Sequence, residues 1–125
     1  MNQRVDGAHV READLRHLES LWDGALGAAF AAFRAMAGPE VALAAALVET
    51  GIGLHGLGHH VPSPGELLIG DLCLARASRL LAHHAPRHTQ IAFAGAIERA
   101  AATSAGGEGA GSIRDLLTAA LEGGR

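Results

Sequence analysis

The chain has 125 residues, a length that allows one domain with one hydrophobic core. Its net charge is −3 with histidine neutral, and its ten basic residues, all arginine, form no cluster, which argues against nucleic-acid binding. The hydrophobic fraction is 49% while aromatic residues make up only 3%, so the apolar content is largely alanine and leucine. These residues favour helices over strands. The composition therefore predicts a single all-α domain over residues 1–125, a bundle of four to five helices.

The cellular location is predicted from cysteine usage and hydropathy. The single cysteine, Cys73, excludes an intrachain disulfide and fits the reducing cytoplasm, and we interpret it as a small buried hydrophobe. The charged N-terminal segment does not resemble a signal peptide. The apolar stretch Val41–Leu57 is shorter than the roughly 20 residues of a transmembrane helix and contains Glu49, so we predict no membrane span.

The first half of the chain predicts two helices after a flexible start at residues 1–8. Apolar residues recur at steps of three and four and predict one continuous helical stripe with a break or kink near Gly24 and Gly27; they are Leu15, Leu18, Trp22, Ala25, Ala29, Phe33 and Met36. Gly38 is expected to end this helix in a left-handed conformation, and Pro39 to begin the next. This second helix, over about 39–57, is apolar on nearly all faces, which predicts a central position or burial between subunits.

The third predicted helix, over about 65–83, carries an unusual pair, Gly70-Asp71. Glycine within a helix costs about 1 kcal/mol relative to alanine, and a buried aspartate requires a partner. We therefore expect Gly70 to allow a close helix contact and Asp71 to cap a helix or pair with an arginine. The apolar set of this helix excludes Arg76 and Arg79 and consists of Leu67, Leu68, Leu72, Leu74, Leu80 and Leu81.

The last third of the chain predicts two more helices. One covers about 89–104, with an apolar face of Ile91, Ala94, Ile97 and Ala101. A glycine-rich linker at 106–111 is expected to be flexible. The other helix begins with Ser112 as its N-cap, followed by Asp115 three residues later.

Histidine is the abundant site-forming residue, with eight in the chain. His55 and His59 are four residues apart and would share a helix face, so with His60 they form a candidate zinc site. The sequence places no cysteine or carboxylate directly beside them. A metal-binding or sensor protein is therefore one alternative function, whereas nucleophilic serines and catalytic carboxylate pairs have no support.

Two stretches resemble trans-isoprenyl (polyprenyl) diphosphate synthases. Residues 66–82, with Gly70-Asp71 inside a Leu/Ala-rich run, resemble a helix of that family. Residues 42–60, an Ala-rich run containing Glu49, resemble the helix that precedes the family's first aspartate-rich motif. The resemblance implies part of the synthase helical fold, with Glu49, His55, His59, His60, Gly70 and Asp71 at motif positions in structural or interface roles.

The departures from the family's motifs imply that this chain has no catalytic residues of its own. Gly58-His59-His60-Val61-Pro62 stands in place of the Asp-Asp-x-x-Asp motif that binds Mg²⁺, and imidazoles are poor substitutes for hard oxygen ligands. Some enzymes of this family are heterodimers with a degenerate small subunit. The resemblance therefore implies a non-catalytic small or regulatory subunit, with no cofactor of its own and Mg²⁺ only in its catalytic partner. A self-associating helical domain that forms homo-oligomers is the other alternative.

Overall fold

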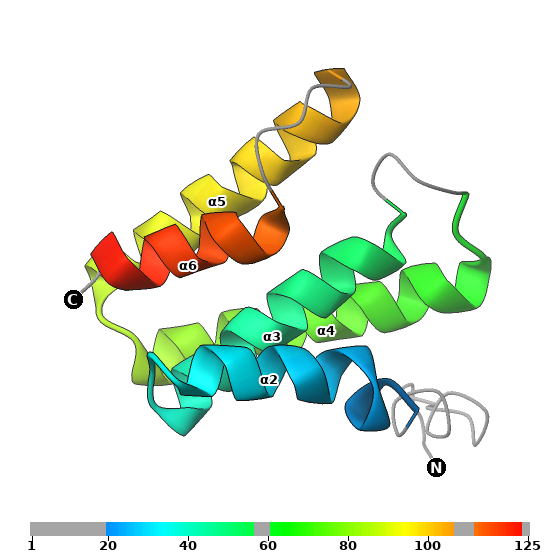
Figure 1. Cartoon of the computed structure of the whole chain (residues 1–125). Helices are drawn as coiled ribbons and strands as arrows, with labels where there is room; N and C mark the ends of the chain where they lie inside the picture. The colour runs from blue at the N-terminus through cyan, green and yellow to red at the C-terminus, as the bar shows by residue number, and fades with distance from the viewer. Residues whose placement is uncertain (1–19, 57–60, 107–111, 124–125) are drawn as a thin grey trace, which may run out of the picture.

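The computed structural model describes residues 20–56, 61–106 and 112–123, and this part of the chain is helical and contains no strand (Figure 1). The predicted all-α class is therefore confirmed. The helices are α2 (Ala25–Arg34), α3 (Pro39–Leu54), α4 (Pro64–His84), α5 (Arg87–Gly106) and α6 (Ile113–Gly123). The predicted flexible start at 1–8 and residues 107–111 of the predicted linker at 106–111 lie outside the described residues, whereas Gly106 is the last residue of α5 and not part of a linker.

The helices form two groups that meet along α3 (Figure 1). Helix α3 packs against α4 on one side and α2 on the other, while α5 and α6 form a helical hairpin. The two groups meet where α6 contacts α3 and where α5 follows α4. The contacts between the groups are far less extensive than those within each group.

Helix α3 is the centre of the core, as its apolar circumference predicts. Its buried residues are Ala42, Ala44, Ala45, Ala46, Leu47, Val48, Thr50, Gly51 and Ile52. Because α2, α4 and α6 of the same chain contact this helix, its burial requires no second subunit. The apolar circumference of α3 therefore does not by itself indicate a partner.

The ends of α2 and α3 differ in part from the predictions. The predicted break at Gly24 is confirmed, but Trp22 and Ala25 are exposed, so the stripe is not continuous. Gly38 is extended (φ −63°, ψ 167°) as the N-cap of α3, and its predicted left-handed conformation is wrong. The left-handed residue is Gly56 (φ 68°), just after the end of α3, where the lack of a side chain permits this conformation.

The start of α4 is fixed by a capping box that the sequence analysis missed. The Ser63 hydroxyl accepts a hydrogen bond from the Glu66 amide (3.1 Å), and the Glu66 carboxylate accepts one from the Ser63 amide (2.9 Å). Pro64 occupies the first helical turn, where its missing amide proton has no cost. These contacts fix the residue at which α4 begins.

The buried faces of α4 and α5 are not the predicted ones. In α4 the buried residues are Ile69, Gly70, Cys73, Ala77 and Leu81, while Leu67, Leu68 and Leu72 are exposed. In α5, Phe93 and Ala96 are buried and Ile91 is exposed. Leucine and alanine populate both faces of these helices, so apolar periodicity alone does not identify the packed face.

No helix in the ranges 20–56, 61–106 and 112–123 combines the length and the apolar character needed to cross a bilayer.

Candidate association surface

The closest helix contact in the site region is made by two glycines, Gly51 on α3 and Gly70 on α4. A Cβ atom on Gly51 would lie 2.9 Å from the Gly70 carbonyl oxygen, and one on Gly70 would lie 3.0 Å from the Gly51 carbonyl oxygen. Such distances are well below normal van der Waals contact between carbon and oxygen. The predicted role of Gly70, close helix packing, therefore agrees with the structure.

Asp71 pairs with His55, which crosses over Gly70. The distance from His55 Nε2 to Asp71 Oδ1 is 3.0 Å. The ring is half-buried and would collide with a Cβ atom on Gly70, at 2.7 Å from its Cδ2 atom. Asp71 itself is exposed and lies in the middle of α4, so the expectation that it caps a helix is wrong. Among the described residues its partner is His55, not the expected arginine. The histidine lies 16 positions earlier, and no local pattern connects the two residues.

The His55–Asp71 pair bears on the alternative metal site. The structure places a carboxylate beside His55, which the sequence alone does not suggest. His59 and His60 lie outside the described residues. Within the ranges that the structure describes, no three histidine, cysteine or carboxylate side chains converge as metal ligands do.

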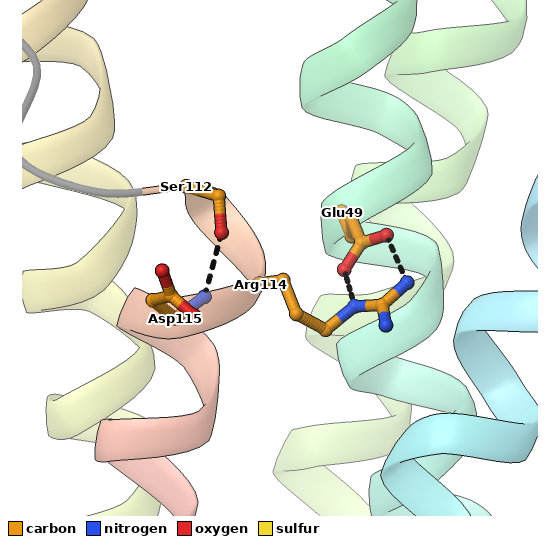
Figure 2. A network of polar contacts seen from close by, with 4 residues as sticks. All are labelled: Glu49, Ser112, Arg114 and Asp115. Atoms are coloured by element: carbon orange, nitrogen blue, oxygen red, sulfur yellow. Dashed lines mark hydrogen bonds and ion pairs between the residues drawn. The ribbon is translucent and has the colours of Figure 1, made fainter.

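Glu49, the other motif position, joins α3 to α6. Its carboxylate accepts two hydrogen bonds from the Arg114 guanidinium, one from Nε (2.5 Å) and one from the Nη2 nitrogen (2.8 Å) (Figure 2). The guanidinium carbon also lies 5.4 Å from the centre of the buried Phe33 ring, a cation–π distance. Hydrogen bonding to Glu49 raises the pKa of Arg114 above its ordinary value. Glu49 therefore has a structural role, for which sequence spacing gives no signal.

The start of α6 agrees with its predicted N-cap. The Ser112 hydroxyl accepts a hydrogen bond from the Asp115 amide at 3.1 Å (Figure 2). The negative charge of Asp115, in the first turn, also interacts favourably with the positive end of the α6 helix dipole. Ser112 thereby sets the position of Arg114 in the first turn of α6, opposite Glu49.

Cys73 lies on the buried face of α4 and has no exposed thiol. Burial raises the pKa of this thiol, so it is protonated at neutral pH. We expect a disulfide reagent such as DTNB to label Cys73 at least about a hundredfold more slowly in the folded chain than in denaturant. Rapid labelling of the folded chain would contradict this burial.

The pKa of the Cys73 thiol is higher in the folded chain than in the unfolded chain. The protonated thiol therefore contributes stability in full below the unfolded pKa, and this contribution is lost as pH rises from the unfolded pKa through the folded pKa.

Helix α4 carries three exposed leucines near its N-terminal end. Leu67, Leu68 and Leu72 are 42%, 47% and 40% exposed. Leu68, Leu72 and the exposed Ala75 follow the spacing of four and three that brings residues onto one helix face. We call Leu67, Leu68, Leu72 and Ala75 the outer α4 face. Towards the C-terminus this side of the helix becomes basic, with Arg76 and Arg79 exposed, which the sequence analysis separated from the leucines.

Comparison with known proteins gives no assignment. No protein-family model, no curated protein and no solved structure matches the chain. The geometry of the site region therefore carries the functional argument. That geometry contains internal contacts at Glu49, His55, Gly70 and Asp71, and exposed leucines on the other side of α4.

Proposed function

We propose that this chain is a non-catalytic small subunit that pairs, through the outer α4 face, with a catalytic polyprenyl diphosphate synthase subunit in isoprenoid biosynthesis. The observation that carries the proposal is the exposure of three leucines on one helix, Leu67, Leu68 and Leu72, of which Leu68 and Leu72 share a face. Clustered exposed leucines are typical of protein association surfaces. The partner class rests on the resemblance of residues 42–60 and 66–82 to the synthase family.

The contacts of the motif-position residues support a non-catalytic role. Glu49 is engaged by Arg114, and Asp71 is engaged by His55. Neither carboxylate is part of a group of three possible metal ligands among the described residues. In this proposal Mg²⁺ and the diphosphate substrates bind to the catalytic partner, and the complex works in the cytoplasm.

Two other functions compete with this proposal. The same leucines favour self-association into a homo-oligomer. The carboxylate of Asp71 beside His55 favours, more weakly, a metal-binding protein in which His55 is a ligand together with His59 and His60. Elemental analysis of the purified chain separates the metal-binding function from the others, because it alone requires stoichiometric zinc or nickel.

Co-purification tests the pairing. The chain would be co-expressed with a tagged catalytic polyprenyl diphosphate synthase from the same organism, as wild type and as the double variant Leu68→Glu/Leu72→Glu. We expect the wild type to co-purify with the synthase and the variant to lose at least about tenfold in retained amount, because two unpaired carboxylates buried in the contact cost more than the roughly 1.4 kcal/mol of a tenfold change.

The matched control is Ile91→Glu, which introduces one charge at an apolar residue that is 63% exposed on a different helix, α5. All variants change exposed side chains, so their unfolding midpoints should equal that of the wild type. Wild type that does not associate with the synthase would overturn the proposed partner. Equal loss in the Ile91 control would show that the outer α4 face is not the contact.

A further inference from the structure

The two helical groups are connected by one very short segment. Helix α4 ends at His84 and α5 begins at Arg87, so only Ala85 and Pro86 join the α2–α4 group to the α5–α6 hairpin. Ala85 is extended (φ −111°, ψ 143°), as expected of a residue that precedes proline. Regular helical hydrogen bonds resume at once on both sides, from the Ala85 amide to Leu81 and from the Gln90 amide to Pro86. A change in the direction of α5 relative to α4 can therefore be confined to these two residues.

The hairpin packs mainly on itself. Helices α5 and α6 contact each other extensively, whereas α5 has only a small contact with α4, and α6 only a small contact with α3. Figure 1 shows the pair as a separate layer beside α3 and α4. Few contacts must break for the hairpin to leave the α2–α4 group as a unit, so it fulfils the first requirement of an exchangeable element.

The surface that receives α6 is specific despite its small size. The bidentate pair of Glu49 with Arg114 fixes both the position and the direction of the guanidinium, and Phe33 packs against its face. Leu117, one turn further along α6, is fully buried. An α6 helix from any source that fits this surface must carry an arginine at the position of Arg114.

We infer that two copies of this chain form a dimer by exchanging their α5–α6 hairpins, so that Arg114 of each copy binds Glu49 of the other. The α6 helix of a second copy meets every requirement of the α3 surface, because it is chemically identical to the helix that already occupies it. Exchange of an identical element through a short hinge is a low-cost route to a two-fold symmetric dimer. This dimer uses α3 and α6, not the outer α4 face, and does not rest on the function proposed above.

Charge reversal distinguishes the exchanged dimer from a closed monomer. In the Glu49→Arg variant, positions 49 and 114 of one chain are both cationic and repel each other. In the Arg114→Glu variant, both positions are anionic and repel each other. Mixing the two variants restores opposite charges only between chains, at both α3 surfaces of an exchanged heterodimer. We expect the equimolar mixture, refolded together from denaturant, to give a 1:1 heterodimer in native mass spectrometry, at least about tenfold more abundant than the dimer of either variant alone.

The double variant Glu49→Arg/Arg114→Glu is the control for folding, because it restores opposite charges within one chain. We expect its unfolding midpoint to recover most of the loss in the single variants. If the double variant recovers while the mixture gives no heterodimer, the pair is only intrachain and the inference is overturned. Co-refolding keeps the test valid even if each single variant is unfolded alone, since the heterodimer would then be the folded species.

Discussion

Gly51→Ala is expected to lower the free energy of unfolding by about 1–3 kcal/mol, although alanine is the better helix former. The added methyl group would lie 2.9 Å from the Gly70 carbonyl oxygen, 3.0 Å from Leu74 Cγ and 3.2 Å from Cys73 Cβ. The first of these atoms belongs to the backbone of α4, so it can move only if the two helices separate. The loss of packing should therefore exceed the gain of about 1 kcal/mol in helix propensity. Chemical denaturation measures the difference directly.

Gly53→Ala is the matched control in the same helix. A Cβ atom at this exposed position would meet no atom within 4 Å. Only helix propensity then changes, and the free energy of unfolding should rise by up to about 1 kcal/mol. The expected result is that Gly51→Ala lowers the free energy of unfolding whereas Gly53→Ala raises it. Stabilisation by both would mean that α3 and α4 do not approach as closely as the structure indicates.

Thr50→Val is expected to raise the free energy of unfolding by about 1–3 kcal/mol. Thr50 is 7% exposed, and its hydroxyl oxygen has no hydrogen-bond partner among the described residues. Valine has nearly the same shape and a similar helix propensity but no hydroxyl group. The substitution therefore removes the desolvation penalty of the hydroxyl while it keeps the packing of α3. Thermal and denaturant unfolding should both report the gain.

Thr118→Val on α6 is the comparison for this substitution, because its half-buried side chain retains access to water. Its effect should stay within about 0.5 kcal/mol. If Thr50→Val destabilises the chain, the hydroxyl has a partner, such as a buried water molecule, that holds it in the folded state.

The helices and their order were predictable, because they depend on local signals. Pro39 and Ser112 mark helix starts by their backbone chemistry, and both positions agree with the structure. The central position of α3 followed from its apolar circumference. The all-α class needed only the abundance of alanine and leucine and the scarcity of aromatic residues.

The packed faces and the polar pairs were not predictable, because they depend on contacts distant in sequence. Leucine occupies both the exposed and the buried side of α4, so periodicity gave no direction for Leu68 and Leu72. The pair of Glu49 and Arg114 spans 65 positions, and that of His55 and Asp71 spans 16. The cost of a glycine and a carboxylate within a helix drew attention to Gly70 and Asp71, but it did not indicate the histidine that pairs with the aspartate.

The product chain length of the catalytic partner tests the central claim most directly. A polyprenyl diphosphate synthase would be assayed alone, with the wild-type chain, with Leu68→Glu/Leu72→Glu and with Ile91→Glu. If the chain is a small subunit that binds through the outer α4 face, the wild type and the Ile91 variant will change the distribution of product lengths or the rate. The leucine variant will leave the products as the synthase makes them alone. Identical products in all four assays would contradict the account.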